Sequence, residues 1–240
     1  MSKTTLEFLP RYYELALDGS LPPHSLCNYF QEAAGVDAHN LNFGREEGIA
    51  WAIVRMQMEM GKKYSGKDAV TIQTWHAFSD KITSRREFEI KDKDGNVLMK
   101  GSTWWIILDL NTRKITRTPE FLLQRNKENP DFVLEEGNFK AKLPEGLEPV
   151  AVKEFAVRLE DIDINGHVNN THYMAWAMES MPANIRAEKT LKNYKIIFKQ
   201  ECVDGDKVIA KIYDTGNGVY FHELVREDGK EVVRVISEWA

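Results

Sequence analysis

The sequence contains an internal repeat, and this repeat limits the possible folds more than any other feature. The segment FEIKDKDGNVLMKGSTWW, residues 88–105, aligns with HELVREDGKEVVRVISEW, residues 222–239, at a spacing of 134 residues. Each segment places Asp-Gly between two half-apolar runs, which predicts a β-hairpin with a type I′ turn, where positive φ is required. A chain that repeats such a segment at a fixed spacing is expected to fold the same unit twice.

The elements ahead of the two hairpins also correspond. Strand-like alternation recurs in two pairs of segments, 51–60 with 193–203 and 67–78 with 205–216. Apolar and aromatic residues at spacings of three and four predict a long helix before each pair, at 25–42 and 169–186. One long helix on a curved antiparallel sheet is the hotdog arrangement. We therefore expect an α+β chain of two tandem hotdog domains.

The domain boundaries follow from a change in composition. Residues 117–149 are rich in charge, Pro and Gly, which is typical of a connector. The sequence thus predicts an N-terminal hotdog at 1–116 and a C-terminal hotdog at 150–240. The alternative is an unrelated α+β domain followed by another.

Composition excludes several classes of protein. A net charge of −5 argues against nucleic-acid binding, and no apolar run is long enough to insert into a membrane. The N-terminal sequence lacks the pattern of a signal peptide. Cys27 and Cys202 lie far apart, without metal or redox spacing, so a reducing cytoplasm is expected and no cofactor is implied.

The stretch LEDIDINGHVNN, residues 159–170, has the opening of an EF-hand calcium loop, D-x-D-x-N-G, beginning at Asp161. The twelfth position of such a loop needs a bidentate Glu, but His172 stands there. Ile162 and Ile164 are expected in apolar packing rather than in solvent. A metal is therefore not expected.

The same stretch suits catalysis better. Asp163, Asn165 and His167 occupy alternate positions, so in an extended segment they project to one side while Ile164 packs away from them. Such a trio can hold and polarise one water molecule. The N-terminus of the following helix offers unsatisfied N–H groups and a partial positive charge, which suit an oxyanion.

Two stretches of the second half carry a resemblance to a known family. DIDINGHVNNTHYMAWAMES, from Asp161, and YKIIFKQECVDGD, from Tyr194, resemble the active-site segments of the acyl-acyl carrier protein thioesterases. In the first half FGREEGIAWAIVRMQMEM and SGKDAVTIQTW follow in that family's order. The resemblance covers nearly the whole chain. It implies a bacterial-type, cytoplasmic enzyme that hydrolyses acyl-acyl carrier protein thioesters, releases fatty acids and terminates fatty acid synthesis.

The resemblance also implies the site residues. The family's catalytic set falls on four side chains: Asp163, Asn165, His167 and Glu201. Either Glu201 or Asp163 can be the base or nucleophile. We expect the backbone N–H groups of Val168 and Asn169 to receive the oxyanion.

Cys202 offers a different mechanism, with its thiol as nucleophile and His167 as base. Strand alternation argues against it, because Cys202 falls on a mostly apolar face with Tyr194, Ile196, Phe198 and Gln200, opposite Glu201. Cys202 is then a small buried residue. A β-bulge after Gln200 would reverse the alternation and exchange the faces of Glu201 and Cys202.

The first half departs from the motif. Aligning His24 with His167, at a spacing of 143, sets Ser20 against Asp163 and Pro22 against Asn165. Lys62 or Lys63 then stands opposite Glu201. One active site per chain follows, and the first hotdog is expected to shape the acyl pocket. Candidate pocket residues, which core packing explains equally well, are Tyr29, Phe30, Trp51, Val54, Met56 and Met58.

Acyl carrier protein is acidic, so docking on this acidic chain requires a local basic patch. The nearest candidates are Lys189, Lys192, Lys195 and Lys199, with Arg85 and Arg86 as the alternative. Two other functions stay open: an acyl-CoA thioesterase with the same site, and a non-enzymatic acyl-thioester sensor. A homodimer is compatible with either enzyme.

Overall fold

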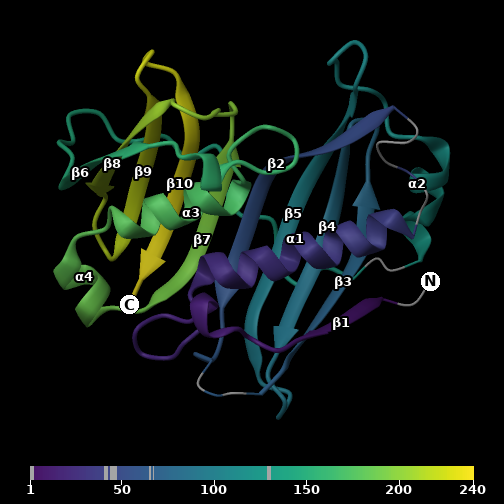
Figure 1. The fold of residues 1–240 in the computed structure, drawn as a ribbon, viewed down its shortest axis with the longest axis horizontal. Coiled ribbons are helices and arrows are strands. Elements are labelled where there is room, and N and C mark those ends of the chain that lie inside the picture. Colours follow the sequence, from purple (N-terminus) through teal and green to yellow (C-terminus); the bar gives the residue numbers. More distant parts are fainter. Residues whose placement is uncertain (1–2, 41–42, 44–47, 65, 67, 129–130) are drawn as a thin grey trace. The chain divides into compact units, whose positions relative to one another are not determined.

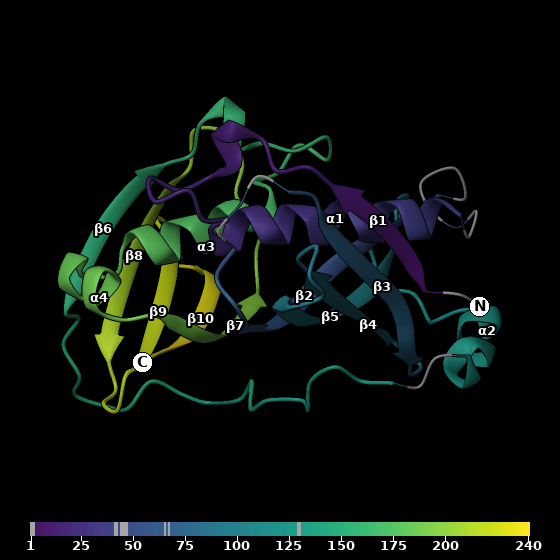
Figure 2. The same ribbon diagram turned by 90° about the horizontal axis from the view of Figure 1, so that it is seen from below.

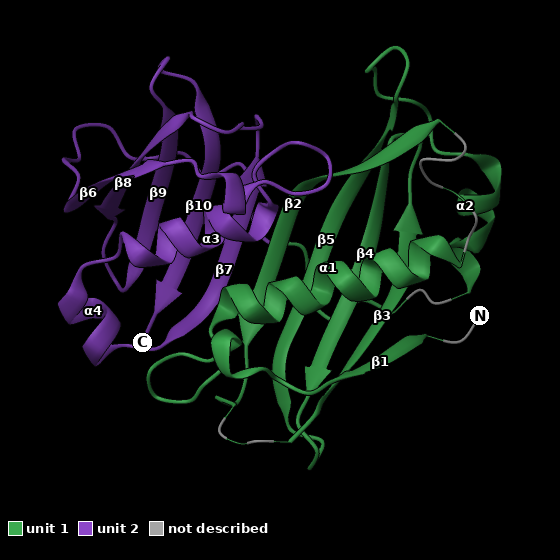
Figure 3. Ribbon diagram, viewed as in Figure 1, with its two compact units in different colours: residues 1–136 green, residues 137–240 purple. Residues whose placement is uncertain are grey.

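The computed structural model describes residues 3–40, 43, 48–64, 66, 68–128 and 131–240. These residues form two compact units, residues 1–136 (unit 1) and residues 137–240 (unit 2), coloured separately in Figure 3. The boundary between the units falls inside the segment for which the sequence predicts a connector. Part of the resembling stretch in the first half, GREE at 44–47, lies outside the described residues.

Unit 1 is a five-stranded antiparallel sheet with one long helix across a face (Figure 1). The strands are β1 (Thr4–Phe8), β2 (Ile49–Met60), β3 (Val70–Ser79), β4 (Thr83–Lys91) and β5 (Val97–Asp109). Their order in the sheet is β1-β3-β4-β5-β2. The helix is α1 (Pro23–His39), preceded by the 3-10 turn η1 (Tyr12–Glu14). A short helix α2 (Glu120–Gln124) and the 3-10 turn η3 (Arg125–Lys127) follow the sheet.

Unit 2 repeats this plan with shorter elements. Its strands are β6 (Ala151–Ala156), β7 (Leu191–Phe198), β8 (Lys207–Asp214), β9 (Val219–Arg226) and β10 (Glu231–Trp239), in the order β7-β10-β9-β8-β6. The 3-10 turn η4 (Leu159–Asp161) leads to helix α3 (Asn170–Glu179), which lies across the sheet, and α4 (Ala183–Glu188) follows. In each unit the helix covers one face of its own sheet (Figure 2). The predicted α+β arrangement of tandem hotdogs is confirmed.

The second predicted helix is shorter than expected. The sequence predicts one helix over 169–186, but α3 ends at Glu179 and α4 begins at Ala183. Pro182 separates them as the N-cap of α4. Proline has no N–H to donate and disfavours a helical residue before it, so a continuous helix cannot pass through it. Among the described residues no helix is both long and apolar enough to cross a membrane.

The two Asp-Gly hairpins form at the predicted places, but the predicted type I′ turn is wrong. In the first hairpin the Asp92 N–H donates to the Asn96 carbonyl (2.9 Å), and the Gly95 N–H donates to the Asp92 carbonyl (3.0 Å). Gly95 has φ of +82°, whereas Asp94 keeps negative φ. A single left-handed glycine after a tight turn is the three-residue hairpin with a bulge, which relieves Asp94 of the positive φ that type I′ imposes. The second hairpin repeats the pattern between Arg226 and Lys230.

The predicted pocket residues of unit 1 lie mostly in its core. The Phe30 ring stacks on Phe88 at 4.3 Å between centroids. Gly101 makes room for it, since a Cβ there would stand 2.3 Å from the Phe30 ring. Tyr29, Met56 and Met58 are buried as well, while Trp51 and Val54 are half-buried. Phe30 therefore packs α1 onto its sheet, and Met56 and Met58 contact Cys27 of α1 from the sheet side.

The basic pair Arg85 and Arg86 does not offer a docking surface. Arg85 donates to Glu87 (2.6 Å) and to the Leu134 carbonyl (2.5 Å), and it is buried. The Arg86 guanidinium donates to Asp37 on α1 (2.6 Å). Both charges are neutralised inside unit 1, because a buried cation is stable only with a partner. The alternative docking prediction is wrong for this reason.

Candidate active site

The segment that carries Asp163, Asn165 and His167 is a tight turn rather than an extended strand. The Asp163 N–H donates to the His167 carbonyl (2.8 Å), and the Gly166 N–H donates to the Asp163 carbonyl (3.0 Å). Gly166 adopts φ of +82°, which glycine tolerates without a steric penalty. Ile164 stands at the tip of the turn and is 90% exposed. The predictions of an extended segment and of a packed Ile164 are therefore wrong.

Asp163 and Asn165 form a pair within this turn. The Asn165 N–H donates to Asp163 Oδ1 (2.7 Å), and the Asn165 side-chain amide donates to Asp163 Oδ2 (3.1 Å). This is the Asx-turn geometry that Asp favours in loops. Both carboxylate oxygens of Asp163 are thus engaged by Asn165, which reduces their availability as a base.

His167 is brought against Glu201. His167 Nε2 lies 2.9 Å from Glu201 Oε2, with the side chains 24% and 58% exposed. Strand β7 ends at Phe198, earlier than the predicted 203, because the N–H groups of Lys199 and Gln200 both turn to the Val232 carbonyl. The chain then leaves the sheet with Glu201 toward His167. The structure thus joins two predicted residues from segments more than thirty positions apart.

Cys202 holds the neighbouring backbone in place. Its N–H donates to the Tyr173 hydroxyl on α3 (2.9 Å), and its carbonyl accepts the Val168 N–H (2.9 Å). The side chain is fully buried, although Gln200 on the same predicted face is exposed. Burial raises the pKa of the Cys202 thiol, which disfavours the thiolate that a nucleophile requires. The sequence places Tyr173 only within the helix predicted over 169–186 and does not indicate this contact.

The two N–H groups assigned to the oxyanion are already occupied. The Val168 N–H donates to the Cys202 carbonyl, and the Asn169 N–H donates to the Asp161 carbonyl (2.8 Å). In this arrangement neither can receive an oxyanion, so that prediction is wrong. The Asn169 side chain caps α3 by accepting the Thr171 N–H (3.1 Å). The N–H of Asn170, the first residue of α3, has no acceptor among the described residues.

The calcium-like spacing has a different explanation. Asp161 Oδ1 lies 3.1 Å from His172 Nδ1, so the side chains at the first and twelfth positions of the loop are in contact. The Asp161 side chain is only 1% exposed. Within the described part of the chain, no group of three or more His, Cys, Asp or Glu side chains is placed to hold a metal.

Unit 1 contains the same turn at a spacing of 147 residues. The Ala16 N–H donates to the Ser20 carbonyl (2.8 Å), and the Gly19 N–H donates to the Ala16 carbonyl (2.9 Å). Helix α1 then begins at Pro23, as α3 begins at Asn170. The predicted alignment of His24 with His167 at a spacing of 143 is therefore wrong, because it slips by four residues.

The corrected correspondence leaves unit 1 without the trio. Ala16 replaces Asp163, Asp18 replaces Asn165, and Ser20 replaces His167. The Lys63 ammonium lies 2.5 Å from Asp18 Oδ2, in a loop that follows β2 as the Glu201 loop follows β7. Of the two lysines that the sequence sets opposite Glu201, only Lys63 contacts the turn in the described residues; Lys62 pairs with Asp92.

Models of a known protein family match both units. The acyl-ACP thioesterase N-terminal domain matches residues 2–125, and the acyl-ACP thioesterase C-terminal domain matches residues 145–240.

Curated relatives and solved structures agree with this match. The chain is 29% identical to a palmitoyl-acyl carrier protein thioesterase, chloroplastic, of Cuphea hookeriana, over 97% of the chain and 61% of that protein. It is 30% identical to the Arabidopsis thaliana protein of the same description, over 97% and 63%. The chain therefore spans less than two thirds of the length of these relatives.

The fold matches solved structures over nearly their full length. An acyl-ACP thioesterase from Bacteroides thetaiotaomicron superposes with a TM-score of 0.87 at 22% identity, covering 99% of this chain and 98% of that one. The 12:0-ACP thioesterase from Umbellularia californica gives 0.80 at 22% identity, covering 99% and 97%.

Proposed function

The chain belongs to the acyl-ACP thioesterase family, and we propose that it hydrolyses acyl-acyl carrier protein thioesters to release free fatty acids. This activity terminates fatty acid synthesis by removing the acyl chain from its carrier. The observation that carries the proposal is the His167–Glu201 pair at 2.9 Å, beside the start of α3 and the Asp163–Asn165 turn.

In the proposed mechanism the His167–Glu201 pair activates water. With its proton on Nε2, His167 donates to Glu201, and its Nδ1 lone pair can accept a proton from water. The resulting hydroxide attacks the thioester carbonyl carbon. Asp163 and Asn165 fix the turn that carries His167 and can orient the attacking water. Glu201 stabilises the imidazolium that forms, as a carboxylate beside a histidine does.

The tetrahedral intermediate needs a donor for its oxyanion. We assign this role to the Asn170 N–H, since the Val168 and Asn169 N–H groups are bonded to carbonyls. It lies at the positive end of α3, where a developing negative charge is stabilised. The C–S bond then breaks, and the carrier leaves as a thiolate, which takes the proton that His167 removed from water; a free thiol has a pKa of about 8.5. A leaving group of this acidity needs little assistance.

We propose that unit 1 shapes the acyl pocket and does not catalyse the reaction. Its turn carries Ala16, Asp18 and Ser20, which cannot activate water in the same way. The carrier docks on a basic patch made by the lysines around β7: Lys189, Lys192, Lys195 and Lys199. A cytoplasmic location, which suits two buried free cysteines, and a homodimer complete the proposal.

The test is an assay of thiol release from acyl-acyl carrier protein and acyl-CoA substrates that carry the same acyl chains, over a range of chain lengths. Faster hydrolysis of the carrier-bound substrates is expected. Equal rates on both would support an acyl-CoA thioesterase. Binding without release from either would indicate the non-enzymatic sensor and overturn the proposal.

A further inference from the structure

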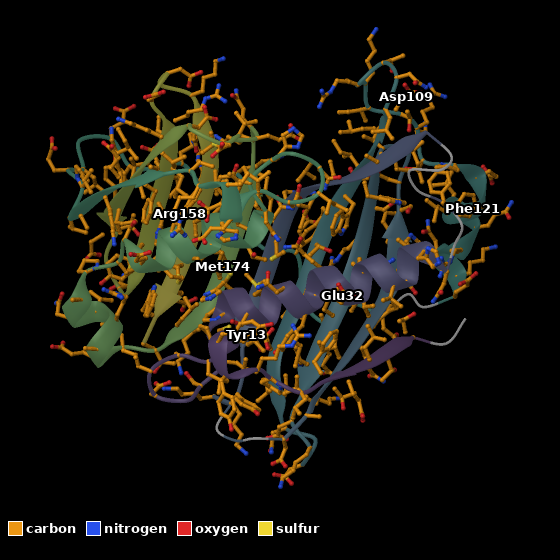
Figure 4. The ribbon with its side chains drawn as sticks, viewed as in Figure 1. Tyr13, Glu32, Asp109, Phe121, Arg158 and Met174 are labelled. Carbon is orange, nitrogen blue, oxygen red and sulfur yellow. The ribbon has the colours of Figure 1, made fainter. Side chains whose placement is uncertain are left out.

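Asp161 is a buried carboxylate beneath the turn that carries the candidate catalytic residues. Its Oδ2 accepts the Arg158 N–H (2.8 Å), and its Oδ1 accepts from the Arg158 guanidinium (3.4 Å). The same Oδ1 lies 3.1 Å from His172 Nδ1. Its backbone carbonyl accepts the Asn169 N–H (2.8 Å). Asp161 therefore contacts both the segment before the turn and the first residues of α3. Figure 4 labels Arg158 ahead of the turn and Met174 on the helix.

His172 is the helix side of this contact. It stands in the first turn of α3, and its own N–H donates to the Asn169 carbonyl (2.9 Å). Its Nδ1 faces the buried Asp161 carboxylate at 3.1 Å. The two ends of the segment 161–172 are thereby tied together, and Asp163, Asn165, His167 and the Asn170 N–H all lie between them.

We propose that Asp161 and His172 are positioning residues, which hold the turn with His167 in register with the N-terminus of α3. This inference rests on the proposed function, because it assigns the pair an effect on thioester hydrolysis. Neither residue has to touch the substrate. Reaction geometry is sensitive to displacements of about 1 Å, which a loose turn permits.

Unit 1 supplies a matched control for this proposal. Glu14 corresponds to Asp161: it accepts the Arg11 N–H (2.7 Å) and a hydrogen bond from the Tyr29 hydroxyl of α1 (2.8 Å). The residue at the position of His172 is Ser25, whose hydroxyl donates to the Glu14 carbonyl (2.8 Å). The same turn and helix are thus joined in both units. Where unit 2 has the carboxylate–imidazole pair Asp161 and His172, unit 1 has Glu14 and Ser25 at the corresponding positions.

The experiment compares Asp161→Asn, His172→Ala and His172→Gln with Glu14→Gln, measuring kcat and KM for one acyl-acyl carrier protein substrate together with the thermal midpoint. Asp161→Asn and His172→Ala should lower kcat about 10- to 100-fold with KM nearly unchanged. His172→Gln, whose amide can still donate to Asp161, should restore part of the rate. Glu14→Gln should keep the wild-type kcat.

Amide hydrogen exchange gives a readout that is independent of catalysis. Exchange of the Asp163 and Asn169 amides should become faster in Asp161→Asn, while exchange in the sheet stays as in the wild type. Unchanged kcat and exchange in folded Asp161→Asn would overturn the positioning role while leaving the hydrolase proposal intact. An equal loss of kcat in Glu14→Gln would also overturn it, because the effect would then be general to the fold. An inactive wild type with faster exchange in the variant would instead sink the hydrolase proposal alone.

Discussion

The turns ahead of α1 and α3 share the same backbone hydrogen bonds but carry different pairs of side chains. Each is closed by the same two backbone hydrogen bonds, each has a left-handed glycine, and each presents an exposed apolar residue at its tip, Leu17 or Ile164. In unit 2 a histidine meets a glutamate across the turn. In unit 1 an aspartate, Asp18, meets Lys63 instead. The same backbone turn thus carries the proposed proton-transfer pair in unit 2 and a Lys–Asp ion pair in unit 1.

The N-termini of the two helices also differ in the residues at the N-cap and at the first helical position. Helix α3 begins with Asn169 as N-cap and Asn170 as its first residue, and α1 begins with Pro22 and Pro23 at these positions. The N-cap backbones are similar, with φ and ψ of −69° and 155° at Pro22 and −58° and 133° at Asn169. Proline suits the first position of a helix but removes its N–H. The α1 terminus therefore lacks the N–H that we propose as the oxyanion donor at the α3 terminus.

The largest predicted effect comes from removing the groups that unit 1 lacks. Asp163→Asn, His167→Ala and Glu201→Gln should each lower kcat by about two orders of magnitude or more. His167 and Glu201 form the proposed acid–base pair, and Asp163 fixes the turn that carries His167. The measurement is steady-state thiol release, with circular dichroism to verify folding. A near-normal rate in Glu201→Gln would remove that residue from the catalytic set.

The next prediction tests the difference between the two helix N-termini by removing the N–H at the first position of α3. Asn170→Pro gives α3 the first residue of α1, and Asn169 already has the extended backbone that a following proline requires. The variant should fold and lose about 100- to 1000-fold in kcat, the typical cost of one oxyanion donor. Asn170→Ala, which keeps the N–H, is the matched control and should stay near the wild-type rate. Equal kcat values in the two variants would exclude this N–H as the donor.

A smaller effect is expected at the basic surface of unit 2. Lys199 already pairs with Glu231, so Lys192 and Lys195 are the better targets. Reversing both charges to Glu should raise KM for acyl-acyl carrier protein roughly 3- to 10-fold, because exposed charge pairs contribute at most about 1 kcal/mol each. The effect should diminish at high salt. Hydrolysis of a small neutral thioester should change little; an equal change on both substrates would argue for a structural role.

The smallest effect concerns Cys202. Its backbone, rather than its thiol, makes the contacts to Val168 and Tyr173. Cys202→Ala should therefore keep kcat within about threefold while lowering stability by about 1 kcal/mol. Thiol-alkylating reagents should react slowly with the wild type. An acyl-cysteine trapped on Cys202, together with an inactive but folded Cys202→Ala, would favour the thiol mechanism.

Much of this molecule could be predicted from its sequence. The repeat, the alternating strands and the Asp-Gly hairpins depend on local pattern, which is strong here, so the tandem fold follows from it. The break of the second helix at Pro182 was also readable, since proline is a local signal. The bulged turn at Asp94-Gly95 was not, because type I′ and bulged hairpins share the same dipeptide.

The candidate site was less accessible to sequence reasoning. Alternation implied an extended segment at Asp163–His167, but Gly166 permits a turn that exposes Ile164. Which N–H groups stay free depends on carbonyls from distant residues, such as Cys202, and no local pattern encodes such contacts. The Asp161–His172 contact had one signal: a carboxylate at the first position of a calcium-like loop with a histidine, rather than a glutamate, at the twelfth.

A paired measurement tests most directly the central claim that chemistry belongs to the turn of unit 2. The double variants His167→Ala/Glu201→Gln and Asp18→Ala/Lys63→Met remove, in each unit, the side-chain pair that joins the turn to a distant loop. Both are assayed for fatty acid release from one acyl-acyl carrier protein at saturating substrate. The unit 2 variant should lose at least about 100-fold in kcat, and the unit 1 variant should stay within about threefold of the wild type. Comparable losses in two folded variants would contradict the claim.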